Sequence, residues 1–189
     1  MSTPYANLSP DAIVDCVEAI GYRCDLRLLA LNSYENRVYQ VGIEDETPII
    51  AKFYREGRWS DEQILEEHAF ALTLADHGLS VVAPLEVNGN TLHAINGQRF
   101  SLFPRRGGHP PELDNFDHLL LLGRTLGRIH RVGASLSMAH RPTLSIDRMV
   151  TESKTFVLKH FVPADLKEAY SSLADDCERA VRELLSTHN

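Results

Sequence analysis

The sequence predicts an α+β fold in which an antiparallel sheet with one long helix is followed by a mainly helical segment. Two observations carry this prediction. Apolar runs of strand length, separated by polar turns, fill most of 26–103, and apolar residues at helical spacing dominate 113–189. With 189 residues, 43% of them hydrophobic, the chain is long enough for one globular domain or for two small lobes with separate cores.

The first helix is expected in the stretch "LSPDAIVDCVEAIGY". Ser9 is a favoured N-cap residue, Pro10 suits the first helical position, and Gly21 is typical of a helix end. The spacing of three apolar residues predicts one buried face, formed by Ile13, Val17 and Ile20.

Three strands follow, in "LRLLAL", "RVYQVGI" and "PIIAKFY". Ser60 and Gln63 then form a capping box that begins a long helix over 61–78. Beyond this helix, two Asn-Gly pairs, which favour tight hairpin turns, separate three apolar runs: 81–87, 91–95 and 99–103. We expect a sheet of five strands in all.

The stretch "PRRGGHPPE" breaks the regular patterns on both sides and predicts a linker. The predicted domains are a first lobe over 1–103, the linker over 104–112, and the first helices of a second lobe over 113–189. Long helices are expected over 114–133 and 162–188. One face of the first of these is expected to pack closely on another element, and it carries Phe116, Leu119, Leu120, Gly123, Leu126, Gly127 and His130.

Composition excludes several classes of partner. The net charge of −7 and the pI near 5.7 give no general attraction to nucleic acid or to anionic membranes. No apolar run reaches membrane-spanning length and no signal peptide is evident, so a cytoplasmic location is expected. The nine histidines show no metal-ligand spacing, and we expect reduced structural thiols at Cys16, Cys24 and Cys177.

Lys52 is the first candidate functional residue, because it lies in the apolar strand "IIAKFY". A lysine there costs several kcal/mol unless its ammonium meets an anion or reaches water at a sheet edge. The following helix offers two adjacent carboxylates, of which Glu67 keeps better phase with the apolar face and is expected to pair with Lys52. Glu66 is then expected to be exposed to solvent.

The loop before the second strand, "NSYENR", is longer and more polar than a hairpin requires. The small lobe of protein kinases has the same order of parts: a strand, a loop, a second strand, a third strand with a lysine, and a helix with a glutamate. The loop would then cover nucleotide phosphates, using backbone N–H groups and the side chains of Asn32, Ser33 and Asn36 in place of glycines. Taken alone, it is equally compatible with a plain polar turn.

Four stretches resemble the bacterial stress response kinases, a Ser/Thr protein kinase subgroup of the aminoglycoside phosphotransferase and choline kinase-like family. They are "LNSYENRVYQV", "KFYREGRWSDEQILEEHAFALTLADHG", "VAPLEVNGNTL" and "LGRTLGRIHRVG". The resemblance implies a bilobal kinase-like fold, ATP with magnesium, and protein substrates. It also implies that Ser33 approaches ATP, that Lys52 binds its phosphates with Glu67 as partner, and that backbone groups around Leu102, Phe103 and Pro104 form the hinge facing adenine.

The family's catalytic loop, "HGDxHxxN", and its later magnesium-binding aspartate have no counterpart here. The nearest imitation, "HRPTLSID", has proline in place of the base, and we expect a surface turn there. The resemblance covers slightly more than half of a family member, so we expect a fragment or a truncated product. We expect this chain to bind ATP but to hold no catalytic residue. We expect the magnesium ligands to lie outside it, so that the chain is inactive alone.

Two alternatives come from other functional classes. Small-molecule phosphotransferases share the lobe design, so the chain is also consistent with a fragment of such an enzyme. A non-catalytic module that self-associates through the apolar faces of its last helices is the second alternative.

Overall fold

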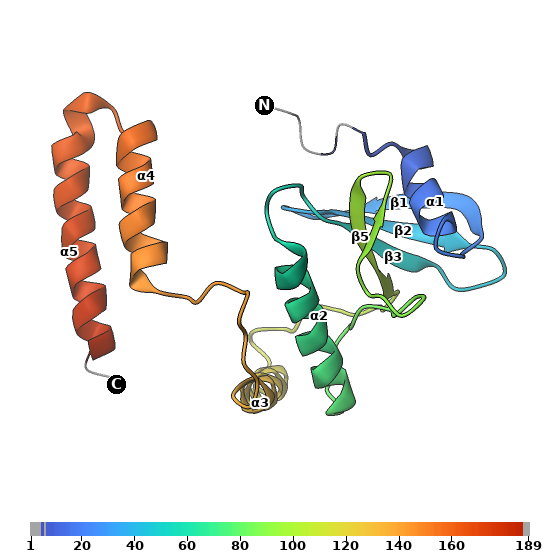
Figure 1. The fold of residues 1–189 in the computed structure, drawn as a ribbon. Coiled ribbons are helices and arrows are strands. Elements are labelled where there is room, and N and C mark those ends of the chain that lie inside the picture. The colour runs from blue at the N-terminus through green and yellow to red at the C-terminus, as the bar shows by residue number, and fades with distance from the viewer. Residues whose placement is uncertain (1–4, 6, 187–189) are drawn as a thin grey trace. The chain divides into compact units, whose positions relative to one another are not determined.

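The structure is a computed structural model that describes Tyr5 and residues 7–186. Two compact units divide the chain, one within 1–141 and one within 142–189, and each is described by itself. Among the described residues, the first unit holds the sheet and three helices, and the second holds a pair of helices (Figure 1).

The sheet has five antiparallel strands in the order β1-β2-β3-β5-β4, which confirms the predicted number. Residues 24–31 and 37–43 form the first hairpin, and the third strand pairs with the last. The strands are β1 (Cys24–Leu31), β2 (Arg37–Ile43), β3 (Ile49–Phe53), β4 (His93–Ile95) and β5 (Gln98–Pro104).

Helix α1 (Pro10–Glu18) covers one face of the sheet and begins as predicted. The Ser9 hydroxyl accepts a hydrogen bond from the N–H of Ala12 at 3.2 Å. The predicted apolar face of α1 is buried with the sheet residues in one core, where the rings of Phe53 and Phe100 stack at 5.3 Å between centroids. This core contains Ile13, Cys16, Val17, Ile20, Val41, Ile43, Ile49, Ala51 and Leu102.

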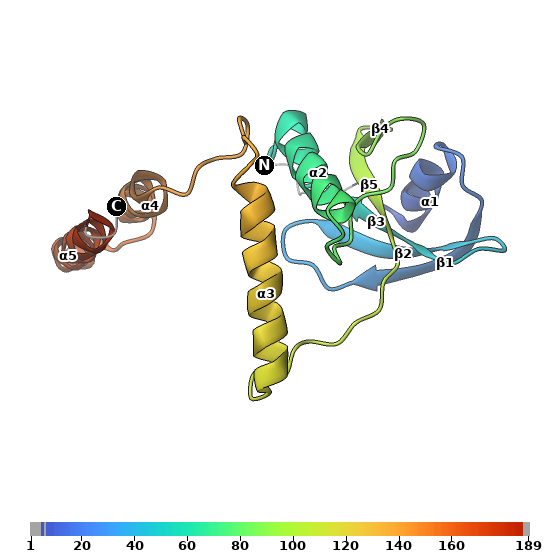
Figure 2. The ribbon, with the colours of Figure 1, turned by 90° about the horizontal axis from the view of Figure 1, so that it is seen from below.

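Strand β3 separates the core from the opposite face of the sheet. Side chains alternate along a strand, and Ile49, Ala51 and Phe53 are buried in the core. Ile50 and Lys52 therefore point to the other face, where helix α2 lies (Figure 2). The alternation thus places Lys52 outside the apolar core although its strand is largely buried.

Helix α2 (Asp61–Asp76) confirms the predicted capping box. The Ser60 hydroxyl accepts from the N–H of Gln63 at 3.3 Å, and the Gln63 side chain accepts from the N–H of Ser60 at 3.0 Å. These reciprocal bonds satisfy two donors that the first helical turn would leave unpaired.

The two Asn-Gly turns adopt the left-handed backbone that tight hairpins need, with φ of 51° at both Asn88 and Asn96. The second turn joins β4 to β5 as predicted, but the run 81–87 is not a strand. Apart from an isolated bridge between Val87 and Asn90, it pairs by one bond from the N–H of Leu85 to the carbonyl of Leu102, at 2.8 Å. Pro84 has no N–H to donate, so the run cannot continue a ladder.

Helix α3 (Phe116–Gly133) begins at Asn115, whose side chain accepts from the N–H groups of its first turn. The face expected to pack closely on another element lies exposed, and Phe116 is 86% exposed. Only the last turns of α3 approach α2, where Val132 packs with Leu74 and Leu79. That expectation was therefore wrong for most of the helix within the described unit.

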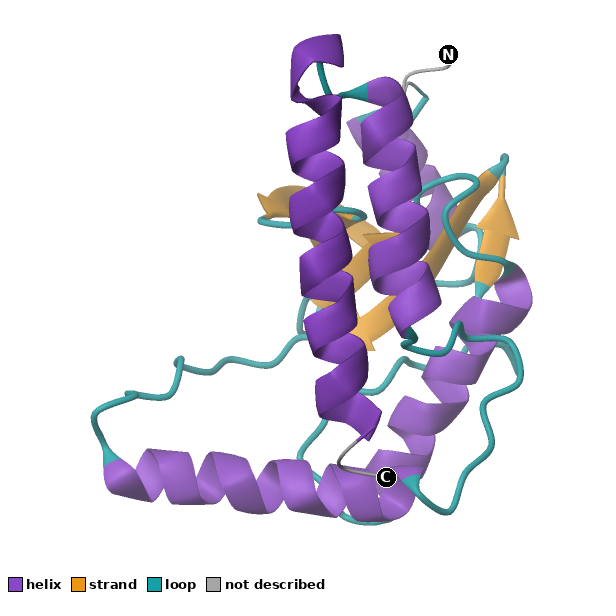
Figure 3. Cartoon of the chain, turned by 90° about the vertical axis from the view of Figure 1, so that its left-hand side faces the viewer, coloured by secondary structure: helices purple, strands orange, loops and turns teal. Residues whose placement is uncertain are grey.

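The second unit is an antiparallel helix pair (Figure 3). A π-helical turn (Asp147–Glu152) leads into α4 (Ser153–His160), and a short 3-10 turn (Ala164–Leu166) leads into α5 (Lys167–Ser186). The sequence predicted α5 but did not single out α4. The predicted end of the last helix at His188 lies outside the described residues.

Candidate functional site

A pocket of about 380 Å³ opens on the face of the sheet opposite α1. The sheet register explains its wall, because Val38 pairs with Lys52 and Ile50 pairs with Phe103 across neighbouring strands. Helix α2 and the segment before β4 supply the other walls. The lining residues are Val38, Ile50, Lys52, Glu67, His68, Ala71, Val82, Pro84, Phe103, Pro104 and Arg106.

Lys52 and Glu67 form an ion pair in this pocket, with Nζ and Oε1 3.4 Å apart. The ammonium also lies 5.0 Å from the ring centre of Tyr54 and 5.9 Å from that of Phe103. The Lys52 side chain is 22% exposed and that of Glu67 is 41% exposed. The predicted pairing is confirmed, and it leaves a partly desolvated cation facing a mainly apolar cavity.

The electrostatic surroundings lower the pKa of Lys52. Burial is the main cause, the positive charge of Arg141 adds to it, and the carboxylate of Glu35 opposes it. A desolvated ammonium with little compensation gains most from a further anion, because low surrounding polarity strengthens the attraction.

Arg141 is a site residue that the sequence did not reveal. Its guanidinium bonds the second oxygen of Glu67, so that Lys52 and Arg141 share one carboxylate. The same guanidinium lies 4.4 Å from the ring centre of Trp59. Since Arg141 lies 74 positions after Glu67 in the chain, no local pattern predicts this contact.

Glu66 is not left to solvent, contrary to expectation. Its carboxylate is half-buried and accepts from the successive N–H groups of Ala139, His140 and Arg141, at 2.5, 3.1 and 2.6 Å. Burial opposes ionisation, yet these three donors hold the pKa of Glu66 below its ordinary value. Gln63 adds a bond to the carbonyl of His140 at 2.9 Å. One turn of α2 thus fixes the segment 139–141.

His68 lies close to Lys52 and is buried. Its ring nitrogens bond the Tyr54 hydroxyl at 2.8 Å and the Thr91 hydroxyl at 2.9 Å. Burial, with the nearby charge of Lys52, lowers the pKa of His68 to about 4. A neutral imidazole therefore lies beside the ammonium at neutral pH.

The loop residues predicted to face phosphates hold the loop in shape. The Ser33 hydroxyl donates to the carbonyl of Asn36 at 2.7 Å, and the Asn36 side chain accepts from the N–H of Arg55 at 3.4 Å. Asn32 is exposed. None of the three lines the pocket as the described residues form it. Their part in ligand binding stays a prediction.

The three predicted hinge residues differ in position, because Phe103 and Pro104 line the pocket and Leu102 does not. The Leu102 side chain is buried in the core on the α1 side, and its carbonyl already accepts from Leu85. The Phe103 side chain lines the pocket. Of the predicted site residues, the structure therefore brings Lys52, Glu67 and Phe103 together.

The described residues offer neither a cluster of metal ligands nor a membrane-spanning helix. Over Tyr5 and 7–186, no three His, Cys, Asp or Glu side chains are grouped to hold a metal ion. Within the same residues, no helix combines the length and the apolar character needed to cross a membrane. The cysteines are free, with Cys16 and Cys24 buried and Cys177 exposed.

Proteins similar to this chain include stress response kinase A of Escherichia coli (strain K12), which is 42% identical over 178 residues, 94% of this chain and 54% of the relative. Serine/threonine protein kinase RdoA of Salmonella typhimurium is 39% identical over 97% of this chain and 56% of the relative. The chain thus spans about half the length of the curated relatives it matches.

Two solved kinase structures share the fold of this chain. Amicoumacin kinase hAmiN, in complex with AMP-PNP, Ca²⁺ and Ami, superposes with a TM-score of 0.70 at 21% identity, over 90% of this chain and 53% of the kinase. The microcompartment-associated aminopropanol kinase superposes with a TM-score of 0.60 at 16% identity, over 79% of this chain and 54% of the kinase.

A model of the phosphotransferase enzyme family matches residues 27–187. Together with the paired lysine and glutamate beside the pocket, this match shows that the chain belongs to the phosphotransferase enzyme family.

Proposed function

We propose that the chain is the ATP-binding portion of a Ser/Thr protein kinase of the stress response kinase A type. One observation carries the proposal: a partly buried lysine, paired with a helix glutamate, lines a pocket whose other walls are mainly apolar. Nucleotides combine a flat apolar base with several negative charges, and this pocket offers a matching surface for each part.

The residues present fit ATP in two regions. Val38, Ala71 and Phe103 would hold the base between apolar side chains, and Lys52 would meet the phosphates. The N–H groups of 32–36, with Asn32, Ser33 and Asn36, would cover the phosphates from above. When bound, ATP would supply the transferable phosphoryl group; this chain's own residues bind it, orient it and keep water from the base.

The described residues do not fit magnesium, because they hold no group of carboxylates placed for a cation. We propose that the magnesium ligands and the catalytic aspartate belong to the part of the relatives that this chain does not span, and we expect the chain alone to transfer no phosphate. The lobe boundaries at 1–103, 104–112 and 113–189 and a cytoplasmic location belong to the same proposal.

A Ser/Thr protein acceptor is supported by the name of the relative in Salmonella typhimurium. A small-molecule acceptor is the alternative, and the names of the two solved kinases that share the fold favour it. Acceptor assays on a full-length family member, with a protein and with small alcohols or amines, separate the two.

Calorimetric titration with ADP and with AMP-PNP tests nucleotide binding. We expect saturable binding to the 189-residue chain and a loss of at least about tenfold in affinity for Lys52→Ala, because the pocket then lacks the ammonium that pairs with Glu67. Lys154→Ala is the matched control, since Lys154 pairs with Asp175 and Glu178 in the other unit. Equal affinity of the wild type and Lys52→Ala would refute the proposal.

Phosphate transfer and molecular mass test the remaining alternatives. Incorporation of labelled phosphate by this chain, abolished by Lys52→Ala, would contradict the expected inactivity. A stable oligomer that binds no nucleotide would instead favour the self-associating module.

A further inference from the structure

The loop 32–36 is anchored through Glu35, a residue that the sequence analysis did not single out. One carboxylate oxygen of Glu35 accepts from the indole N–H of Trp59 at 2.7 Å, and the other accepts from Arg58 at 2.8 Å. The hydroxyl of Tyr5 donates to the backbone carbonyl of Glu35 at 2.8 Å. The side chain that restrains this loop therefore contacts the turn that precedes α2 and does not line the pocket as the described residues form it.

Trp59 also contacts the ion-pair side of the site. The guanidinium of Arg141 lies 4.4 Å from the centre of its ring, and the same guanidinium bonds Glu67, the partner of Lys52. The carbonyl of Trp59 accepts from Arg99 at 3.0 Å, which fixes its backbone at the start of the helix. The indole is thus held between the loop and the pair.

These contacts form one continuous path in which charges alternate. It runs from Glu35 through the indole to Arg141, then to Glu67 and Lys52. A displacement of Glu35 moves the hydrogen-bond acceptor of the indole, and the indole in turn sets where Arg141 lies. Because Arg141 and Lys52 share one carboxylate, the position of Arg141 decides how strongly Glu67 holds the ammonium.

We propose that Trp59 is a positioning residue that couples the loop 32–36 to the Lys52–Glu67 pair, so that the loop and the cation respond together to a nucleotide. The proposal rests on the nucleotide site proposed above. Trp59 does not line the pocket as the described residues form it, so it acts through Glu35 and Arg141 and not by touching the ligand.

Intrinsic fluorescence is a direct reading of this coupling, because Trp59 is the only tryptophan in the sequence. Titration of the wild-type chain with AMP-PNP is expected to change the indole emission, with the same midpoint as the calorimetric titration. Calorimetric binding without any change in emission would overturn the proposal, since the surroundings of the indole would then not depend on whether nucleotide is bound.

A double-mutant cycle measures the coupling itself. Trp59→Phe keeps a ring for Arg141 but removes the N–H donated to Glu35, and Glu35→Ala removes the acceptor. Each change is expected to weaken AMP-PNP binding about fivefold. The double mutant is also expected to bind AMP-PNP about fivefold more weakly than the wild type, because both changes interrupt the same path. Independent effects that multiply to about 25-fold, or no effect of either change, would contradict the coupling.

Glu56→Ala is the matched control, because Glu56 is an exposed carboxylate of the neighbouring turn. It is expected to bind as the wild type does. Thermal unfolding checks that each variant is folded. If Trp59→Phe does not fold, Glu35→Ala decides, because it retains the indole. Loss of the nucleotide-induced emission change supports the coupling, and an unchanged response overturns it.

The failure of this inference is distinguishable from that of the proposed function. A wild-type chain that binds no nucleotide, or a Lys52→Ala variant that binds normally, refutes the site and the coupling with it. The other outcome is that the wild type binds nucleotide, Lys52→Ala does not, and the effects of the Glu35 and Trp59 changes multiply. This outcome supports the site and refutes only the coupling.

Discussion

The two units of the chain are stabilised in different ways. The sheet unit has a true apolar core, in which Phe53, Phe100 and Leu102 are completely buried beneath α1. In the helix pair, no residue of α4 or α5 is buried, and Phe156 and Leu173 are 56% and 65% exposed. Burial of apolar surface therefore stabilises the first unit far more than the second.

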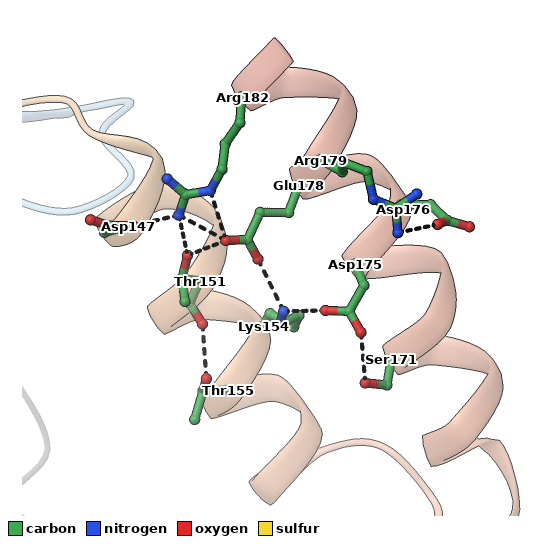
Figure 4. Close-up of polar contacts among 10 residues, drawn as sticks. All are labelled: Asp147, Thr151, Lys154, Thr155, Ser171, Asp175, Asp176, Glu178, Arg179 and Arg182. Carbon is green, nitrogen blue, oxygen red and sulfur yellow. Dashed lines mark hydrogen bonds and ion pairs between the residues drawn. The ribbon is translucent and has the colours of Figure 1, made fainter. Parts of the chain in front are cut away.

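Charged side chains join the helices of the second unit (Figure 4). The ammonium of Lys154 lies 2.6 Å from Asp175 and 3.0 Å from Glu178. Glu178 also accepts from Arg182 and Thr151, each at 2.8 Å. Hydrogen bonds from Arg182, Thr151 and Lys154 lower the pKa of Glu178 to about 2. Salt should therefore weaken the helix pair and leave the sheet unit nearly unchanged.

Removing a core ring should have the largest effect. Phe53→Ala is expected to lower the free energy of unfolding of the sheet unit by about 3–5 kcal/mol, because it empties a fully buried site. Phe156→Ala makes the same change at a half-exposed position of α4 and is expected to cost less than about 1 kcal/mol. Urea unfolding followed by circular dichroism measures both, and equal losses would contradict the comparison.

Acidification should weaken the sheet unit through His68. Its pKa is about 4 in the folded state against 6.5 for an ordinary histidine. Between these values the unfolded chain binds the proton and the folded chain does not, so stability falls as pH falls from 6.5 towards 4. The expected loss is about 3 kcal/mol.

His68→Gln, which has no proton to gain, should reduce this pH dependence. His77→Gln, at the exposed position that follows α2, is the matched control. Urea unfolding at a series of pH values measures the slope, and an unchanged slope in His68→Gln would show that other groups cause it.

Loss of the Glu66 carboxylate should loosen one segment without unfolding the sheet. A glutamine has one acceptor oxygen in place of two, and it cannot satisfy all three N–H groups of Ala139, His140 and Arg141. In Glu66→Gln we expect these amides to exchange with solvent about tenfold faster. Glu62→Gln, on the exposed first turn of α2, is the control, and equal exchange in both variants would argue against the contact.

The smallest expected effect is in the helix pair. Glu178→Gln removes the charge that Lys154 and Arg182 share, and it should lower the midpoint of thermal unfolding of α4 and α5. Salt screens charges near the surface, and the Arg182 side chain is 46% exposed, so the wild-type chain should move part of the way towards the variant at about 1 M NaCl. A difference that persists undiminished at high salt would show that packing, and not charge, joins the helices.

Local patterns predicted much of the sheet unit. The capping box at Ser60 and Gln63, the N-cap at Ser9 and the Asn-Gly turn before β5 each involve residues close in sequence. The Lys52–Glu67 pair was also predictable, because a strand lysine with apolar neighbours requires a partner and the next helix offers one in phase.

Contacts between distant segments could not be read from such patterns. Arg141 reaches Glu67, and Glu66 binds the N–H groups of 139–141, only because α3 returns the chain to α2. The exposed face of α3 shows the converse error: helical spacing identifies an apolar face but not whether another element covers it. The run 81–87 was apolar enough for a strand, but Pro84 has no N–H to donate to a neighbouring strand.

The site of nucleotide contact on the isotopically labelled chain tests the central claim most directly. In amide NMR spectra recorded during titration with AMP-PNP, we expect the largest shifts at residues around Lys52, Ala71 and Phe103, and we expect Lys52→Ala to remove them. Shifts confined to α4 and α5, or no shifts at saturating nucleotide, would contradict the account.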